Sequence, residues 1–336
     1  MGRHSRKYIS ILLGLMVVVL FAADILFGSV AISASDIWKS IVGGDVEPTI
    51  RTIVIDIRVV KAIVALVAGI SLSISGLQMQ TLFRNPLAGP YILGVSAGAS
   101  FGVALFTLGI PIAGLSLSPM LTSLGSAGAA WVGAAAIMMI IVLLARRIRD
   151  VMVILILGMM LSSALSAVVE ILQYQSNEAA LKSYVVWTMG SLGNVTLGQL
   201  ATILPIFAVG TLLSISSIKG LNAILLGETS AATVGINVTR LRRTLYTSTT
   251  LLAGTVTAFC GPIGFIGLAA PHIARMIFRT ADHRTLLPTS AMVGAAMLLA
   301  ADIVTTTIHL PINTITALMG IPVVVYIVIR RPNQMQ

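Results

Sequence analysis

Charged residues are scarce in this chain. They make up 10% of its 336 residues, against about 25% in soluble globular domains. Hydrophobic residues make up 57%, and the mean hydropathy is +1.01. One soluble domain cannot bury so much apolar surface, because cores stop growing at about 250–300 residues. The composition excludes a soluble enzyme, a nucleic-acid-binding module and a disordered scaffold, and it indicates a polytopic membrane protein.

Cysteine and the common nucleotide-binding motif are also lacking. The single Cys260 excludes an internal disulfide and a cysteine-based metal cage. None of the five lysines follows a glycine, so the Gly-Lys-Ser/Thr element of a Walker A loop is absent. The four histidines form no close metal-ligand pair. We therefore predict that this chain binds no ATP, metal or other cofactor of its own.

Long apolar runs make up most of the sequence. A helix needs about 20 residues to cross a bilayer. Ten runs of roughly this length lie at 8–28, 59–82, 92–110, 120–145, 151–172, 196–216, 244–260, 262–279, 286–308 and 312–329. In the third run Gly94, Gly98 and Gly102 recur every four residues, a spacing typical of close helix packing in membranes. We predict an all-α fold of about ten transmembrane helices.

The basic residues are unevenly distributed between these runs. With a cytoplasmic N-terminus, sixteen of them lie inside and five outside, as the positive-inside rule requires. The sequence therefore predicts a multi-pass inner-membrane protein with both termini in the cytoplasm. The five outer residues are Lys39, Arg51, Arg58, Lys61 and Lys182. The inner residues include Arg146, Arg149, Arg242, Arg243 and Arg331.

Three polar segments lie between the runs. Residues 31–57 and 173–195 are predicted to be external, and residues 217–243 form the longest cytoplasmic loop. Leu221, Leu225 and Leu226, followed by Glu228, indicate a short surface helix in that loop. We predict a single transmembrane domain over residues 1–336. Because it has no soluble domain, coupling to an energy source must involve a partner.

Acidic residues within or near the apolar runs are candidates for ion coupling, because ionisable groups in lipid are costly and usually functional. Asp24 and Glu170 lie near the outer ends of their runs, where we expect water to reach them. Only Asp302 lies well inside a run. Two interpretations of Asp302 stay open. It is either a structural carboxylate between helices or the proton site of an ion-coupled secondary carrier.

Three groups of motifs resemble one family. The first is RNPLAGPYILGVSAGA at 84–99. The second is GPIGFIGL at 261–268, with Pro271-His272 and then DHRTLLP at 282–288. The third is Ala301-Asp302, LPI at 310–312 and TALMGIP at 316–322. In this order they resemble the FecCD-type permeases, the membrane subunits of ABC importers for iron-siderophores, haem and cobalamin.

The resemblance implies a cobalamin-importer-like permease fold, with two copies of the chain, a homodimer, around a central pathway. It also implies separate ATPase subunits that bind ATP and Mg²⁺, an external substrate-binding protein, and no enzymatic activity of this chain. Residues 226–236 resemble the coupling helices of the family, which sit in a groove of the ATPase. The coupling residues implied are Gly227, Glu228, Ala231, Ala232 and Gly235.

Arg58 and Lys61 occupy positions where the family carries an outer basic pair that meets acidic residues of the binding protein. They are three residues apart, so at the start of a helix they share one side. We predict that they dock the binding protein, with anchoring at the lipid headgroups as the alternative. The resemblance places further motif residues along the pathway: Asn85, Pro86, Leu87, Gly94, Ser96, Gly98, Gly264, Gly267, Pro271 and His272.

The cargo is indicated by departures from the family pattern. Thr305–Thr307 stand where cobalamin-type members carry a further outer arginine, and His309 stands where a glutamate commonly precedes Leu-Pro. The run WTMGSL at 187–192 is closer to the usual iron-chelate pattern. We therefore predict a permease for a ferric siderophore or haem, with cobalamin as the alternative within the family.

Overall fold

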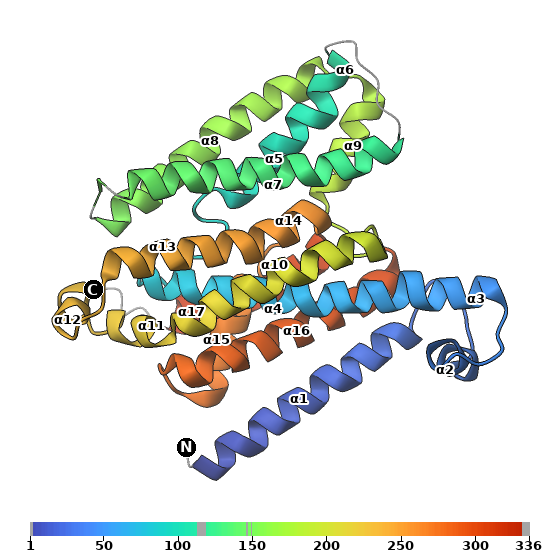
Figure 1. Ribbon diagram of the computed structural model, residues 1–336, viewed down its shortest axis with the longest axis horizontal. Coiled ribbons are helices and arrows are strands. Elements are labelled where there is room, and N and C mark those ends of the chain that lie inside the picture. The colour runs from blue at the N-terminus through green and yellow to red at the C-terminus, as the bar shows by residue number, and fades with distance from the viewer. Residues whose placement is uncertain (1–2, 113–118, 146, 149, 331–336) are drawn as a thin grey trace. The chain divides into compact units, whose positions relative to one another are not determined.

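The computed structural model describes residues 3–112, 119–145, 147–148 and 150–330. Arg146, Arg149 and Arg331, which were counted for the orientation, lie outside the described residues. The described residues form helices joined by turns, with no strand among them (Figure 1). The prediction of an all-α fold is confirmed.

Each predicted run falls on a helical segment. Within the described residues, six of the segments have the length and hydropathy of a full membrane span: Ser5–Leu26, Val95–Ile112, Gly125–Leu144, Val151–Gln175, Leu197–Ser216 and His283–Ile308. The segments that match the ten runs are α1 (Arg3–Leu26), α4 (Val60–Leu82), α5 (Val95–Ala104) with η2 (Leu105–Gly109) and α6 (Ile110–Ile112), α7 (Pro119–Leu144), α8 (Val151–Gln175), α10 (Leu197–Ser216), α13 (Val238–Thr249) with η3 (Thr250–Gly254) and α14 (Thr255–Cys260), α15 (Ile266–Phe278), α16 (His283–Ile308) and α17 (Ile312–Arg330).

The polar segments also contain short helices. Residues 31–57 fold as α2 (Ala34–Val42), α3 (Pro48–Thr52) and the π-helix η1 (Ile53–Val59). Residues 173–195 contain α9 (Glu178–Thr188), and residues 217–243 contain α11 (Ile218–Ile224) and α12 (Glu228–Thr233) before α13. Side-chain caps start three of these helices, because Ser33, Asn177 and Asn237 accept hydrogen bonds from backbone N–H groups of the first turn.

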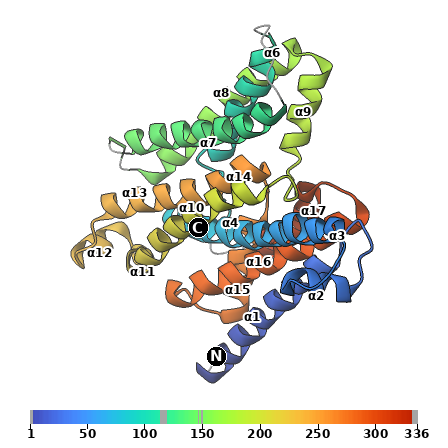
Figure 2. The ribbon, with the colours of Figure 1, turned by 45° about the vertical axis from the view of Figure 1, so that its right-hand side comes forward.

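The chain divides into two compact units. Unit 1 comprises Met1–Ile74, Ser191–Pro205 and Ile263–Gln336, and unit 2 comprises Ser75–Gly190 and Ile206–Pro262. Helices α4 and α10 continue from one unit into the other. In unit 1, α16 packs against α1, α15 and α17 (Figure 1). In unit 2, α5 packs against α7 and α8, and α14 packs against α7 (Figure 2). A single permease domain over the whole chain stays a prediction.

Glycines allow α5 and α7 to pack closely. A Cβ atom at Gly98 would clash with the carbonyl group of Gly133, and one at Gly102 with that of Ala129. The predicted packing role of Gly98 and Gly102 is confirmed, since without side chains the two backbones come into direct contact. Gly94 has a φ of 81° and is the N-cap of α5.

Candidate functional site

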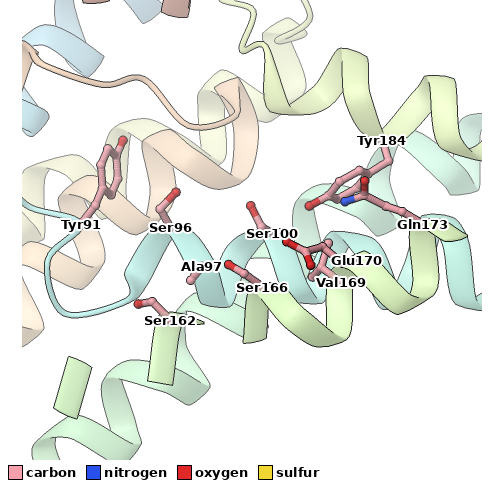
Figure 3. A pocket seen from close by; sticks show the side chains of 10 residues that line it. All are labelled: Tyr91, Ser96, Ala97, Ser100, Ser162, Ser166, Val169, Glu170, Gln173 and Tyr184. Atoms are coloured by element: carbon pink, nitrogen blue, oxygen red, sulfur yellow. The ribbon is translucent and has the colours of Figure 1, made fainter. Parts of the chain in front are cut away.

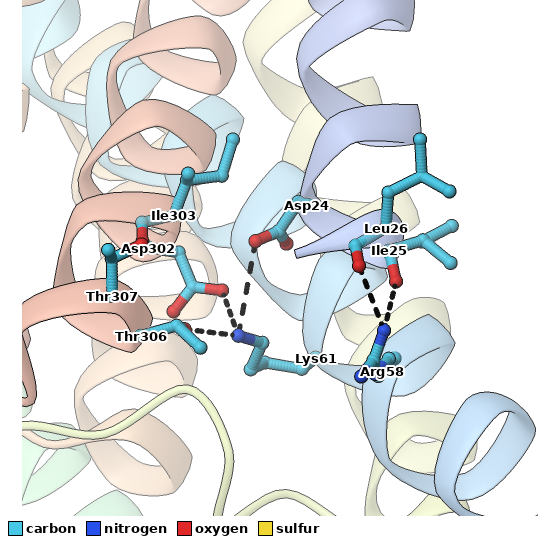
Figure 4. Close-up of polar contacts among 9 residues, drawn as sticks. All are labelled: Asp24, Ile25, Leu26, Arg58, Lys61, Asp302, Ile303, Thr306 and Thr307. Atoms are coloured by element: carbon cyan, nitrogen blue, oxygen red, sulfur yellow. Dashed lines mark hydrogen bonds and ion pairs between the residues drawn. The ribbon is translucent and has the colours of Figure 1, made fainter. Parts of the chain in front are cut away.

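A cluster of charged side chains lies in unit 1, where α1, α4 and α16 meet (Figure 4). The Nζ atom of Lys61 lies 2.8 Å from Oδ2 of Asp302 and 3.9 Å from Oδ1 of Asp24. It also donates a hydrogen bond of 2.7 Å to Oγ1 of Thr306. Asp24 is fully buried, and the side chains of Lys61 and Asp302 are 13% and 5% exposed. The ammonium group of Lys61 therefore has several polar partners within unit 1.

Arg58 is also occupied within unit 1. Its guanidinium group donates hydrogen bonds of 3.0 Å to the carbonyl oxygens of Ile25 and Leu26, and a further one to Val30. These oxygens lie at and just after the C-terminal end of α1, where carbonyl groups lack helical partners and a positive charge is favourable. Arg58 is only 4% exposed. It therefore caps the first helix (Figure 4).

Neither Arg58 nor Lys61 is a freely exposed cation in the described chain. Carbonyl groups at the end of α1 accept hydrogen bonds from Arg58, and Asp302 of α16 pairs with Lys61. A docking role for these residues stays a prediction, and the described chain exposes little of either side chain. The expectation that water reaches Asp24 is wrong, because its exposed fraction is 0%. The ion pair of Asp302 supports its structural interpretation.

A polar pocket of about 470 Å³ lies in unit 2, between α5, α8 and α9 (Figure 3). Hydroxyl groups, one amide and one carboxylate line it, and none of the described residues in its wall is basic. The lining residues are Tyr91, Ser96, Ala97, Ser100, Ser162, Ser166, Val169, Glu170, Gln173 and Tyr184.

Helix α8 contributes one polar face to this pocket. Ser162, Ser166 and Glu170 recur every four residues, so they lie along the same side of the helix. Most of the rest of α8 is apolar, and its most apolar stretch of 18 residues has a mean hydropathy of 2.4. A carboxylate that faced lipid would be costly, so this face is suited to a water-filled or protein-covered space. Ser96 and Ser100, one helical turn apart on α5, contribute hydroxyl groups to the same pocket.

Tyr184 of α9 lies near Glu170 at one end of the pocket (Figure 3). Burial raises the pKa of its hydroxyl group above the ordinary value of 10, while a hydrogen bond with Ser100 acts in the opposite direction. The phenol therefore stays protonated at physiological pH and can donate or accept a hydrogen bond. Its ring stacks on Trp187, with ring centroids 6.3 Å apart, which holds this part of the wall in place.

The predicted coupling segment, residues 226–236, contains α12, and α11 precedes it in unit 2 (Figure 1). Two glycines bracket α12, Gly227 with a φ of 112° and Gly235 with a φ of 84°. Both conformations favour glycine over residues that carry a Cβ atom. Ala231 is fully buried, whereas Ala232 is exposed. The short helices predicted in this loop are present.

Two arginines fix the coupling segment. Arg84 donates a hydrogen bond of 3.0 Å to the carbonyl oxygen of Ile224 at the end of α11. Arg242 of α13 forms an ion pair with Glu228 at the start of α12. The side chain of Arg242 is 9% exposed and that of Glu228 is 39% exposed. Glu228 therefore begins α12 with a partly exposed side chain and is paired with a nearly buried cation.

Comparison with known proteins identifies the family. The model of the FecCD transport family matches residues 15–330. The chain belongs to the FecCD transport family.

The similarity between this FecCD protein and its relatives extends over almost the whole chain. It is 32% identical to the hemin transport system permease protein of Yersinia pestis, covering 99% of this chain and 98% of that one. It is 35% identical to the vitamin B12 import system permease protein of Escherichia coli O127:H6, covering 98% and 97%. A solved inward-facing structure of a proposed metal-chelate type ABC transporter is 28% identical, with a TM-score of 0.83 and coverage of 96% and 99%.

These findings establish the class of the protein. It is a multi-span permease subunit of an ABC importer, which implies an inner-membrane location and a transport role rather than an enzymatic one. The family implies ATPase and binding-protein partners. The names of the two relatives give different cargoes, hemin and vitamin B12, so similarity does not identify the cargo of this FecCD permease.

The motif residues of the FecCD permease take several local roles. In unit 2, Asn85 accepts a hydrogen bond of 2.9 Å from the N–H of Leu87, which shapes the turn around Pro86 between α4 and α5. Ser96 lines the polar pocket. In unit 1, the N–H of Gly264 donates a hydrogen bond of 3.0 Å to Oδ1 of Asn313. Three motif residues are buried in α15: Gly267, Pro271 and His272.

Sequence patterns alone do not reveal most of this pocket. They do not single out Ser100, Ser162, Ser166 or Tyr184, and they mark Glu170 only as an acid that water can reach. One signal was available. Polar residues four apart on an otherwise apolar helix indicate a face that cannot be left to lipid.

Proposed function

We propose that this permease imports an iron chelate, either a ferric siderophore or haem. An external binding protein delivers the chelate, and separate ATPase subunits that bind ATP and Mg²⁺ drive its passage. Two copies of the chain form the pathway, with both termini of each copy in the cytoplasm. The similarity to a proposed metal-chelate type transporter over nearly the whole chain supports this proposal, as does the similarity to a hemin permease.

The coupling segment carries the observation that best supports an ATP-driven importer. Leu226 and Val234, on either side of α12, are 79% and 70% exposed. Large apolar side chains that project from a well-fixed polar segment are typical of a protein interface. We assign this surface to the ATPase.

The ion pair between Glu228 and Arg242 suggests how the segment transmits motion. It links α12 to α13, and α13 continues through η3 into α14. A displacement of α12 by the ATPase would therefore move this helical segment, because packed elements shift as rigid bodies more readily than they deform. Hydrolysis itself belongs to the partner in this proposal.

The coupling surface can be tested with Leu226→Asp combined with Val234→Asp. Both side chains are exposed, so we expect normal folding but at least about tenfold slower ATP-driven uptake in proteoliposomes, with ATPase binding lost. The matched control is Val42→Asp on α2, where the valine is 64% exposed. Normal uptake by the double variant, with the ATPase still bound, would refute the assignment.

Two other changes in the segment are less suitable tests. Glu228→Arg and Gly235→Trp are also expected to uncouple transport. However, the first would replace the partner of the buried Arg242 by a second positive charge, so the two arginines would repel each other. The second would place a large side chain at a positive φ. Either variant could therefore fail through local misfolding.

Cobalamin is the second candidate cargo, because the vitamin B12 permease is 35% identical to this chain. Purification of the permease with its binding protein, followed by mass spectrometry of the bound ligand, separates the two. An iron chelate supports the proposal, and a corrinoid replaces it. We do not propose an ion-coupled carrier that uses Asp302, because Lys61 pairs with that carboxylate at 2.8 Å.

A further inference from the structure

The polar pocket of unit 2 has an acidic lining. Its polar wall contains Glu170, Gln173, two tyrosines and four serines, and no lysine, arginine or histidine among the described lining residues. The chain as a whole has a net charge of +10, so the sign of the charge in this pocket is opposite to that of the chain.

Glu170 is available to a ligand. Its side chain is exposed, lines the pocket, and forms no ion pair within the described chain. In Figure 3 it lies between Ser100, Ser166 and Tyr184. This carboxylate can accept hydrogen bonds from an ammonium, amide or hydroxyl group, and such charge-assisted bonds are stronger than neutral ones. An anionic group in the same place would be repelled.

The two ends of the pocket differ in character. Glu170, Gln173 and Tyr184 lie at one end, and Tyr91 and Ser96 lie at the other (Figure 3). Ser96 is in the first turn of α5, where backbone N–H groups lack helical partners. A ligand that carries hydrogen-bond donors at one end and oxygen acceptors at the other is complementary to both.

We propose that this pocket is a cargo subsite for an uncharged or cationic, hydrogen-bonding part of the chelate. The inference rests on the proposed function and narrows it. Of the two proposed cargo classes, a siderophore with amide, hydroxyl or ammonium groups matches the lining, whereas the two carboxylates of haem have no basic partner there. The serines supply hydroxyl groups that can donate or accept hydrogen bonds. Glu170 favours a cationic group of the ligand over an anionic one.

The test is direct binding of chelates of different charge to the purified permease in nanodiscs, measured by equilibrium dialysis. The probes are ferrioxamine B, which carries an ammonium group, ferrichrome, which is uncharged, and hemin, which carries two carboxylates. Cyanocobalamin is the fourth probe and represents the alternative cargo. We expect both siderophores to bind more tightly than hemin. Glu170→Gln should weaken binding of ferrioxamine B about tenfold, since a charge-assisted bond is lost, and that of ferrichrome by less than about threefold.

Matched variants keep the test specific. Ser166→Val replaces a hydroxyl group of the lining by methyl groups and should weaken binding of both siderophores. Ser163→Val should not, because Ser163 is exposed on the same helix and lies outside the lining. Glu178→Gln on α9 is the control for loss of a carboxylate, since Glu178 is exposed and does not line the pocket. A normal unfolding midpoint for each variant excludes misfolding as the cause.

The outcomes separate this inference from the proposed function. Hemin binding that exceeds siderophore binding and is insensitive to Glu170→Gln and Ser166→Val overturns the subsite and leaves iron-chelate import standing. Binding of cyanocobalamin alone, if Ser166→Val abolishes it, keeps the subsite and overturns the iron cargo. Failure of all four compounds to bind overturns the subsite.

Discussion

The charged cluster of unit 1 and the polar pocket of unit 2 use similar residues in opposite ways. In the cluster, Lys61 pairs with Asp302, and Arg58 donates to the end of α1. In the pocket, Glu170 lies open to a volume of about 470 Å³ without an ion-pair partner in the described chain. Carboxylates occur in both regions, and among the described residues of the two regions Glu170 of the pocket is the one left for a ligand.

The difference shows that a charge within an apolar span does not by itself indicate function. A buried charge is tolerated when an opposite charge and hydrogen bonds compensate its desolvation. Asp24, Lys61 and Asp302 come from helices that are distant in sequence, so sequence alone does not reveal that Lys61 pairs with Asp302. An ionisable group indicates function more strongly when its neighbours leave it unpaired and a cavity lies next to it.

The largest expected effect is that of Arg58→Glu combined with Lys61→Glu. The changes would leave the end of α1 facing a carboxylate and Asp302 without its cation. Breaking a buried pair costs about 3–5 kcal/mol, so we expect little folded protein. The yield of monodisperse protein and its unfolding midpoint measure this loss.

A matched charge reversal shows whether the loss depends on burial. Lys39→Glu with Arg51→Glu changes two exposed residues nearby in the sequence and should fold normally. If the Arg58 and Lys61 variant instead folds with a normal midpoint but no longer binds the binding protein, the docking role is restored and the structural role is wrong.

A smaller effect should separate the two carboxylates of the cluster. Asp302→Asn removes the ion pair at 2.8 Å, whereas Asp24 is 3.9 Å from Lys61. We expect Asp302→Asn to lower the free energy of unfolding by about 1–3 kcal/mol, and Asp24→Asn to change it by less than about 1 kcal/mol. Chemical denaturation in detergent measures both, and the reverse order would contradict the assignment.

The pocket should respond much less in stability. Glu170→Gln and Ser166→Ala change side chains that are exposed, so we expect the free energy of unfolding to shift by no more than about 0.5 kcal/mol. The same denaturation experiment measures this. A loss of 2 kcal/mol or more would show that the pocket is part of the structural framework, and the contrast with unit 1 would fail.

The smallest effect is expected from cysteines that report orientation. In a Cys260→Ala background, Asp45→Cys and Glu178→Cys should react with an impermeant thiol reagent from outside, and Arg243→Cys only after the membrane is opened. All three native residues are exposed, so stability should hardly change. Arg243 is better suited than Arg242, which is buried against Glu228. Labelling of Asp45→Cys only in opened membranes would reverse the topology.

Much of the fold followed from local pattern. In lipid a backbone must satisfy its own hydrogen bonds, so a long apolar run such as Val151–Gln175 has little choice but to be helical. The spacing of Gly98 and Gly102 predicted a packing face because the absence of a side chain is a local property. The coupling segment was found through its motif, with Gly227 and Gly235 at positions that require a positive φ.

The candidate site was less predictable, because it depends on neighbours. Glu170 and Asp24 looked alike in sequence, since both lie near the end of an apolar run. The structure buries Asp24 completely and leaves Glu170 exposed in a pocket. Nothing local distinguishes them, because burial is decided by what packs against each helix.

The sequence alone determined that this is an all-helical membrane permease of the FecCD type, because apolar runs and ordered motifs are one-dimensional features. The tertiary structure decided which charges are neutralised and which stay available. It paired Lys61 with Asp302 across 241 positions of the chain and placed α5, α8 and α9 around a pocket that has no basic residue in its described lining. Electrostatic energies depend on distance and burial in space, and neither can be read from separation along the chain.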